Sequence, residues 1–319
     1  MALDATLAII DSSKVSDYMA CPRRFMFRHV FGWTNSSFHL KFGERFHLAI
    51  EFCLNHGFGK QQIEIAMGIF GQDWPDSYED STKNKNILSA YQALVGYGEE
   101  YSKDDLEVLH TEVGGQVPIS TDPQRLLAFK IDAIVRDRHG NIWALEHKTG
   151  SFYSQVWEAQ WATRYQIHAY THALRLAIPD ENVRGVIVNG IFFLKKKQEF
   201  HRVRVDHQDK MQRLYLDEIN YWIDLLDQDL QEFLKADPEE EILRCFSRKP
   251  DCCTSFNSVC PYYSICSMTA NPKKHEKTNP LGFNVEFWNP LDKEIKTSYD
   301  DLKKQHGGKG QLDDHTEPR

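Results

Sequence analysis

The chain has 319 residues, a formal net charge of −8 at pH 7 and 41% apolar residues. This length allows one large domain or two small ones with a real hydrophobic core. The negative charge argues against a protein whose entire surface binds a polyanion, but it leaves local basic patches such as Lys195-Lys196-Lys197 open as binding surfaces. No apolar run approaches the roughly 20 residues that cross a bilayer, and the start of the chain does not look like a secretory signal. We therefore expect a cytoplasmic protein without membrane contact, whose seven cysteines do not form disulfides.

The first hundred residues have the patterns of helices. A capped helix start at Ser12–Tyr18 runs into Cys21-Pro22-Arg23-Arg24, whose two arginines form a small basic patch. Further helices are expected at about 60–70 and 82–102, so that residues of about 55–102 form a helical insert before the sheet. An apolar stripe with helical period predicts a helix over about 41–55, and its members are Phe42, Phe46, Ala49, Ile50 and Cys53.

After about residue 105 the apolar period changes to that of strands. A helix at about 155–177 and a long amphipathic helix at about 207–236 interrupt and follow these strands. This order predicts one α/β domain over residues 1–270, with a mixed central β-sheet at about 105–206 flanked by helices. Residues 271–319 are a C-terminal extension, and its end, His306–Arg319, is expected to be disordered. The predicted strands lie at about 107–118, 125–136, 141–148, 183–194 and 199–206.

Two of these strands carry acids at matching positions. If the strands pair about His139 in the turn between them, Asp132 lies opposite Glu146, with β-carbons about 4.5–5.5 Å apart. Two carboxylates this close repel each other unless a cation lies between them or one is protonated. Lys148 has the same parity along the strand as Glu146 and therefore projects from the same face. The alternative is a simple ion pair between the lysine and the acids.

These groups have the chemistry of a metal-assisted phosphoryl-transfer site. Hard divalent cations prefer carboxylate oxygen, so Asp132 and Glu146 are predicted to bind Mg²⁺ or Mn²⁺, with the backbone carbonyl of His147 as a further ligand. Lys148 is expected to orient the attacking water or to stabilise developing charge. His47, at the edge of the apolar stripe, is either a third protein ligand or a structural histidine.

The order of these motifs is more informative than any one of them. The chain reads Gly43-x-x-x-His47, then Asp132, then Glu146-x-Lys148, then Gln166-x-x-x-Tyr170. This combination resembles the PD-(D/E)XK nuclease superfamily, in its RecB-like exonuclease branch. The resemblance implies that His47, Asp132 and Glu146 are metal ligands, that Lys148 is the catalytic lysine, and that Gln166 and Tyr170 contact DNA. His147 departs from the hydrophobic or aromatic residue common between the acid and the lysine.

Four cysteines suggest a second metal site. Cys253-x6-Cys260-x5-Cys266 lies near the end of the predicted domain and Cys21 near its start, and cytosolic thiolates at such spacing suggest a soft metal. Zinc ribbons favour paired C-x2-C knuckles, whereas an iron–sulfur cluster does not require them. The layout resembles the iron–sulfur members of the branch, of the AddB, CRISPR-associated and phage types. It implies that a [4Fe–4S] cluster joins the N- and C-terminal segments, with Cys252 as the alternative to Cys253; Cys53 is predicted to be a core thiol and Cys245 a bystander.

The resemblance implies a divalent-metal-dependent DNA exonuclease that acts at single-stranded ends in recombination or repair. The sequence contains no G-x4-G-K-[ST] motif, so the chain would either depend on a helicase or recombination partner to open duplex DNA or act on ends that are already frayed. Arg23 and Arg24 are predicted to add DNA contacts. Two alternatives are a catalytically inactive DNA-binding or scaffolding subunit with the same fold, and a restriction-type endonuclease.

Overall fold

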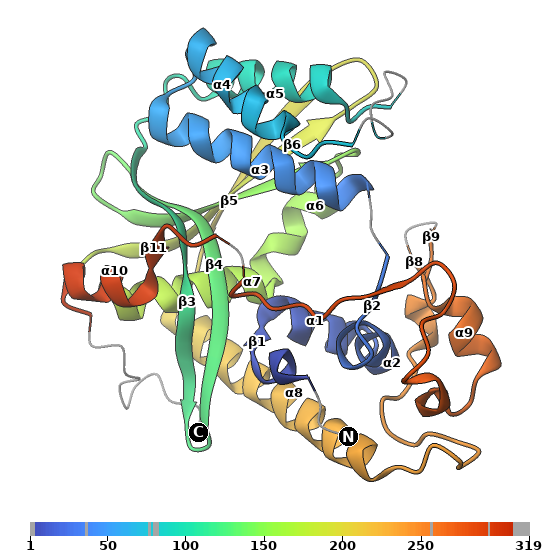
Figure 1. Cartoon of the computed structure of the whole chain (residues 1–319). Helices are drawn as coiled ribbons and strands as arrows, with labels where there is room; N and C mark the ends of the chain where they lie inside the picture. Colours follow the sequence, from blue (N-terminus) through green and yellow to red (C-terminus); the bar gives the residue numbers. More distant parts are fainter. Residues whose placement is uncertain are drawn as a thin grey trace.

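A mixed seven-stranded sheet forms the centre of the part of the molecule that the computed structural model describes, namely residues 4–35, 38–75, 78, 83–255, 258–292 and 294–308 (Figure 1). Its order is β11-β3-β4-β5-β6-β7, and β1 pairs with β4 off this path. Only the pairs β1·β4, β11·β3 and β5·β6 of this described sheet are parallel. The predicted α/β fold with a mixed central sheet is therefore confirmed. The strands are β1 (Ile10–Asp11), β3 (Glu107–Thr121), β4 (Gln124–Arg136), β5 (Ile142–Gly150), β6 (Val183–Phe193), β7 (Gln198–Asp206) and β11 (Thr297–Ser298).

Helices cover both faces of the sheet (Figure 1). Strand β6 shows this most directly, because the side chains of successive residues along it point to opposite faces of the sheet. Val186 and Val188 belong to the apolar cluster that includes α7 and α8, whereas Ile191 and Phe193 belong to the cluster built on α3, α4 and α5. No described helix is long and apolar enough to span a membrane. These helices are α1 (Ser12–Ala20), α3 (Phe38–His56), α4 (Lys60–Gly71), α5 (Ile87–Glu100), α7 (Tyr165–Ala177) and α8 (Asp209–Lys235).

The β3–β4 hairpin is longer than its neighbours. It pairs over nearly its whole length, but β4 continues against β5 only from Ala133 to Arg136. The outer part of the hairpin therefore projects past β5, where β1 pairs with Leu127 and Ala128 of β4 (Figure 1). The separation of β4 from β5 begins at residue 132, which is where the first predicted acid lies.

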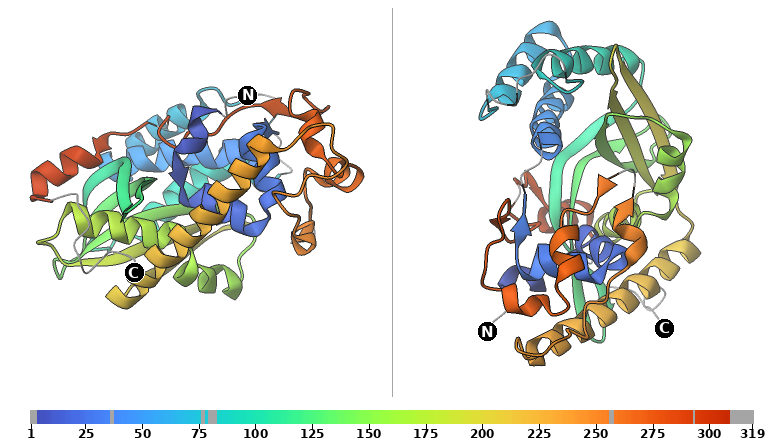
Figure 2. Two further views of the ribbon diagram at one scale, coloured as in Figure 1. Left: turned by 90° about the horizontal axis from the view of Figure 1, so that it is seen from below. Right: turned by 90° about the vertical axis from the view of Figure 1, so that its right-hand side faces the viewer.

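The N-terminal and C-terminal segments lie side by side (Figure 2). β2 (Trp33–Thr34) pairs with β10 (Asn284–Val285), and the Tyr262 hydroxyl donates a 2.6 Å hydrogen bond to the Trp33 carbonyl. An aromatic cluster fills the space between the two segments and includes Phe25, Phe27, Trp33, Phe246 and Tyr262. The remaining elements here are η1 (Ala5–Ala8), α2 (Pro22–Phe25), η2 (Met26–Val30), η5 (Pro250–Cys252), β8 (Thr254–Ser255), β9 (Ser258–Val259), α9 (Tyr263–Met268) and η6 (Pro272–His275).

The chain after residue 290 returns to the central sheet. β11 pairs with β3, and α10 (Tyr299–His306) contacts both β3 and α7. Tyr299 is 3% exposed and joins the larger apolar cluster. Of the end predicted to be disordered, His306 completes α10, and residues 309–319 lie outside the described residues.

The single helix predicted at about 155–177 is wrong in one respect. The structure has α6 (Gln155–Ala159), a 3-10 turn η4 (Gln160–Thr163), and then α7 after Arg164, whose ψ of 127° is extended. No glycine or proline marks this break, so the composition gives no warning of it. The break lets Trp161 join the apolar cluster under the sheet while α6 stays at the surface.

Candidate active site

The β4–β5 turn sets the two predicted acids opposite each other. Ala133 pairs with Leu145 and Arg136 with Ile142, which is the predicted register centred on His139. Asp137 fixes the turn, because its Oδ1 accepts hydrogen bonds of 2.9 Å from the backbone N–H groups of His139 and Asn141. Local turn chemistry thus determines which side chains meet at the far end of the hairpin.

Asp132 occupies the point where the two strands separate. Its Oδ2 accepts a 2.7 Å hydrogen bond from the backbone N–H of His147. The same oxygen lies 3.4 Å from Nδ1 of His47, which reaches it from α3. Burial acts to raise the pKa of Asp132, but His47 and His147 outweigh it and hold this pKa well below its usual range. Asp132 is therefore an anion at the mouth of the strand separation.

Glu146 is the more deeply buried acid. It is 3% exposed, and its Oε1 lies 2.5 Å from the Lys148 ammonium and accepts a 3.1 Å hydrogen bond from Gln166. Its Oε2 is buried and has no hydrogen-bond partner among the described residues. Burial, and then the charge of Asp132, raise the pKa of Glu146, while Lys148 opposes them. This oxygen would gain from a positive charge beside it.

Helix α7 brings the predicted Gln166 and Tyr170 to the same place. Gln166 Nε2 donates to Glu146 and, at 2.7 Å, to the hydroxyl of Tyr170 one turn later. Tyr170 is 5% exposed, so its hydroxyl faces the carboxylates more than it faces solvent. The structure thus brings together His47, Asp132, Glu146, Lys148, Gln166 and Tyr170, and their roles in catalysis stay predictions.

His147 points to the opposite face of β5 from Glu146 and Lys148. Its ring is fully buried, with Nε2 3.1 Å from the Tyr97 hydroxyl and Nδ1 3.3 Å from Asp132. Asn189 donates a 2.6 Å hydrogen bond to Tyr97, and Arg202 donates to Asn189 at 2.7 Å. Because the Tyr97 hydroxyl accepts from Asn189, it donates its own proton to Nε2 of His147. Nε2 is then an acceptor, so the neutral ring carries its proton on Nδ1, which faces Asp132.

Sequence reasoning missed this chain of contacts. The available signal was Asn189, a polar residue in the middle of the apolar run Val186–Phe193 of β6, at the position that pairs with His147. It also missed Glu112, whose neighbours Thr111 and Val113 pair with Ala133 and Ile131, so that it faces Asp132 across the β3–β4 ladder. Glu112 has a φ of 50° and forms an ion pair with Lys130. Nothing in the local sequence signals that conformation.

The two predicted arginines have structural partners. Arg23 is 5% exposed, and its guanidinium donates to the carbonyls of Phe246 (2.8 Å) and Leu243 (3.5 Å). Arg24 donates to Asp17 at 3.0 Å. Their DNA contacts stay predictions, and the geometry of Arg23 is that of an internal clamp between the N-terminal and C-terminal segments.

The four predicted cluster cysteines lie near one another. Burial raises the pKa of the Cys260 and Cys266 thiols, and the charges of Cys21 and Cys253 act on both in the same direction. Cys252 instead donates to the carbonyl of Ala20 at 2.8 Å. Cys53 and Cys245 are both buried in apolar clusters. The predicted joining of the chain ends by four cysteines stays a prediction, because within the described ranges no set of three or more His, Cys, Asp or Glu side chains is arranged to hold a metal ion.

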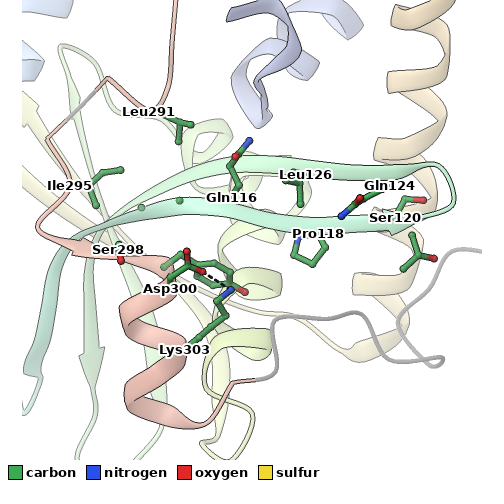
Figure 3. Close-up of a pocket in the computed structure, with 14 residues that line it drawn as sticks. Gln116, Pro118, Ser120, Gln124, Leu126, Leu291, Ile295, Ser298, Asp300 and Lys303 are labelled. Atoms are coloured by element: carbon green, nitrogen blue, oxygen red, sulfur yellow. Dashed lines mark ion pairs between the residues drawn. The ribbon is translucent and has the colours of Figure 1, made fainter.

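A cavity of about 790 Å³ lies away from the acidic pair, between the β3–β4 hairpin and the returning C-terminal segment (Figure 3). Leu291 and Ile295 line one side of it and the Asp300–Lys303 ion pair (2.8 Å) the other. Since none of the predicted catalytic side chains lines this cavity, its size does not mark the active site.

Comparison with known families decides what kind of site this is. Residues 12–267 match the model of the PD-(D/E)XK nuclease superfamily. The chain belongs to the PD-(D/E)XK nuclease superfamily. This superfamily implies DNA as the substrate, and its nucleases typically use Mg²⁺ or Mn²⁺. The match spans all the motifs from Cys21 to Cys266, and it does not distinguish the RecB-like branch from others.

Two further comparisons add little to this assignment. No curated protein matches the sequence significantly. Among solved structures, the crystal structure of SSO0001 matches with 12% identity over 55% of this chain and 74% of that chain, at a TM-score of 0.25. This likeness is too slight to support an inference about this nuclease.

The oxygen donors of this nuclease fit the divalent cation that its family implies. Mg²⁺ is commonly bound through one or two carboxylates, with water and substrate phosphate completing its coordination, so it does not require a cage of three protein side chains. Asp132 and Glu146 supply two carboxylates, and the unpartnered Oε2 of Glu146 is a ready donor. The histidine ring of His47 is close enough to Asp132 to act as a third ligand or as its ion-pair partner.

Proposed function

We propose that this chain is a divalent-metal-dependent DNA exonuclease that hydrolyses phosphodiester bonds at single-stranded ends. The observation that supports it best is the convergence of Asp132, the unpartnered Glu146 oxygen and the Lys148 ammonium at the separation of β4 from β5. Lys148 contacts only Oε1 of Glu146, and a buried carboxylate oxygen without a partner, such as Oε2, is unfavourable, so the arrangement favours the binding of a cation over a purely structural role. The pathway that we propose is recombination or repair, with a helicase or recombination partner that supplies single-stranded ends.

Each side chain has a definite task in this proposal. Mg²⁺ or Mn²⁺ held by Asp132 and Glu146 supplies charge neutralisation on the phosphate and an activated water. Lys148, one third exposed, can turn from Glu146 toward the reacting phosphate and stabilise its developing charge. Gln166 holds Glu146 through Oε1 and so leaves Oε2 directed into the site. His47 keeps Asp132 anionic through their ion pair.

The test is a digestion of end-labelled single-stranded DNA with Mg²⁺ or Mn²⁺. We expect Glu146→Gln and Lys148→Ala each to lower the rate by at least about 10²-fold while DNA binding persists. Lys235→Ala, at the exposed end of α8, is the matched control and should retain the wild-type rate. Wild-type cleavage by either active-site variant would remove that residue from the mechanism. A correctly folded wild-type protein that binds DNA without cleaving it would instead favour the scaffolding alternative.

Circular single-stranded DNA distinguishes an exonuclease from the restriction-type alternative. An obligate exonuclease leaves circles intact, whereas an endonuclease opens them. Oligonucleotides labelled at the 5′ or the 3′ end, digested in parallel, give the polarity. Cleavage of circles at a rate comparable to that of linear strands would contradict the exonuclease proposal, and the protein would then be an endonuclease.

The proposal extends to a [4Fe–4S] cluster on Cys21, Cys253, Cys260 and Cys266. Its support is the 2.8 Å hydrogen bond from the Cys260 backbone N–H to the Cys253 carbonyl, the charges of Cys21 and Cys253 among the causes that raise the pKa of Cys260 and Cys266, and the position of Cys21 directly between α1 and α2. Such a cluster would close a loop of more than two hundred residues and so reduce the entropy of the unfolded chain. Protein purified without oxygen should be brown, with a broad absorbance near ~400 nm and about four iron atoms per chain. A colourless protein with stoichiometric zinc would overturn this assignment.

A further inference from the structure

A basic pocket lies at the carboxyl ends of the parallel strands β5 and β6. Its volume is about 500 Å³. Gly150 pairs with Phe192, so the residues that follow the two strands, Ser151 and Leu194, emerge side by side. The carboxyl ends of parallel strands are a common place for ligands in α/β proteins. The lining residues come from the start of α3, the segment before α5 and the end of β5: Phe38, His39, Lys83, Asn84, Lys85 and Ser151.

The two lysines of this pocket have no carboxylate partner among the residues that the structure describes. Lys85 is 4% exposed, donates to the Thr149 hydroxyl at 3.3 Å, and lies 5.3 Å from the centre of the Phe42 ring. Lys83 is exposed and lies 4.8 Å from the centre of the Phe38 ring. Neither ammonium forms an ion pair with a carboxylate of the described residues, whereas Lys148 does. Burial lowers the pKa of Lys85 to about 8, so most molecules still carry the charge at pH 7.

A buried ammonium without an anionic partner is unfavourable, and a bound anion removes the penalty. The surroundings indicate what kind of anion fits. His39 is exposed beside both lysines. Its partial burial and, to a smaller extent, the charges of Lys85 and Lys83 lower its pKa. Its flat ring at the edge of a basic pocket can stack on a base while the lysines hold a phosphate. The exposed Lys195 and Lys196 follow β6 in the turn before β7 and add positive charge near the same edge, whereas Lys197 pairs with Glu199 at 2.7 Å.

The pocket is connected to the candidate active site by two elements. Ser151 lies three residues after Lys148, which is roughly 10 Å along an extended strand. His39 lies eight residues before His47 on α3, which is roughly 12 Å along a helix. The helix approaches the strand closely here, since a β-carbon at Gly43 would lie 3.4 Å from the Thr149 hydroxyl. For a strand that keeps the stacked spacing of about 3.4 Å per nucleotide found in duplex DNA, the separation is about three nucleotides.

We propose that this pocket is a phosphate subsite for single-stranded DNA, about three nucleotides from the scissile bond, with Lys83 and Lys85 as its cations and His39 as its stacking surface. The proposal rests on the proposed nuclease function and names the part of the substrate that the chain holds beside its active site. Because stacking and phosphate contacts read no base edges, the subsite tolerates any sequence.

The test measures the binding of labelled single-stranded oligonucleotides in EDTA, where hydrolysis does not contribute. Lys83→Ala and Lys85→Met are the variants, and the methionine keeps an apolar stem in the buried position. We expect each to raise Kd about tenfold, equally for different sequences. The slope of log K against log salt should fall by about 0.7 for each lysine. Lys60→Ala, at the exposed start of α4, is the control and should leave both quantities unchanged.

A walk with a single uncharged methylphosphonate linkage locates the contact. In the wild type, one internal position should weaken binding, and that position should lose its effect in Lys83→Ala and Lys85→Met. Oligonucleotides with a free or a phosphorylated 5′ or 3′ end separate an internal phosphodiester from a terminal phosphate as the occupant. Loss of the effect only when a terminal phosphate is removed would move the contact to the strand end.

The failure of this subsite is distinguishable from the failure of the nuclease proposal. If Lys83→Ala, whose exposed side chain makes misfolding a poor explanation, binds within twofold of the wild type with an unchanged salt slope, the subsite is overturned while digestion by the wild type can still stand. If binding depends on the lysines but no condition yields cleavage, the subsite survives and the nuclease proposal fails. A wild type that binds no DNA overturns both.

Discussion

At the scale of single residues, the two acids of the site differ in how well their carboxylates are stabilised by neighbouring groups. Asp132 has a backbone N–H and His47 as partners, whereas Glu146 keeps an oxygen with none. The contacts of Asp132 therefore keep it anionic, whereas the charge of Glu146 depends more on what binds beside it. This difference follows from position, because Asp132 is at the strand separation and Glu146 is under α7.

Two buried histidines on α7 predict how stability depends on pH. His168 Nδ1 donates a 2.8 Å hydrogen bond to Gln212 Oε1, and His172 Nε2 donates one of 2.8 Å to the carbonyl of Pro118. Burial lowers the pKa of each to about 4. Above pH 6.5 both rings are neutral in the folded and in the unfolded protein. As the pH falls below 6.5, the rings bind protons in the unfolded chain before they do so in the folded protein, so stability decreases until about pH 4. The loss is about 3 kcal/mol for each ring at most.

Urea unfolding at pH 7.5, 6, 5 and 4 measures this effect. His172→Gln keeps a donor to Pro118, and we expect its midpoint to fall less than that of the wild type between pH 6.5 and 4. His56→Gln, on an exposed ring at the end of α3, is the matched control. Equal pH profiles for His172→Gln and the wild type would show that the pKa of this ring does not change on folding.

At the scale of elements, the β4–β5 turn determines the register of the site. Asp137 accepts from His139, Asn141 and the indole of Trp143, with distances of 2.9 to 3.0 Å. Asp137→Ala leaves these donors without their acceptor and should cost about 1–3 kcal/mol in the free energy of unfolding. Asp137→Asn retains an acceptor and should lose less.

Chemical denaturation of both variants, alongside the rate of DNA digestion, tests this assignment. The cost of Asp137→Ala should appear in stability, with a much smaller change in rate at low temperature, since the strand pairs from Ala133 to Arg136 are retained. A large loss of activity in a variant of normal stability would mean that the turn takes part in catalysis, which the geometry does not support.

The elements also show what sequence can and cannot predict here. The Asp132–Glu146 register followed from strand parity and a single turn, so local rules were sufficient. The break at Arg164, the left-handed Glu112 and the pairing of Thr297 with Val113 were not predictable, because each depends on a partner far along the chain. The proximity of Cys21 to Cys266 came from family resemblance, not from any periodic pattern.

At the scale of the whole molecule, the C-terminal segment connects the sheet edge to the helix that carries His47. The Lys296 backbone N–H donates to Glu112 at 3.0 Å, and its ammonium lies 2.8 and 2.9 Å from the two carboxylate oxygens of Glu51 on α3. Glu51 is 5% exposed and one turn after His47. Lys296, the residue directly before β11, thus holds α3 against the sheet edge through one ion pair.

Removal of this cation should weaken both stability and activity. Lys296→Ala leaves Glu51 buried with Asn55 and Thr111, each at 3.0 Å, as its side-chain donors among the described residues. Because the lysine side chain is 43% exposed, we expect a cost of about 1–2 kcal/mol in the free energy of unfolding, below that of a fully buried pair.

The digestion rate of Lys296→Ala should fall severalfold, since His47 moves with α3. In the double variant, Glu51→Gln should restore much of the lost stability. Lys304→Ala, which removes the exposed surface pair with Asp301, should change stability by less than about 0.5 kcal/mol and is the control. If the Lys296→Ala and Glu51→Gln effects simply add, the two side chains are not coupled and the C-terminal segment does not position α3.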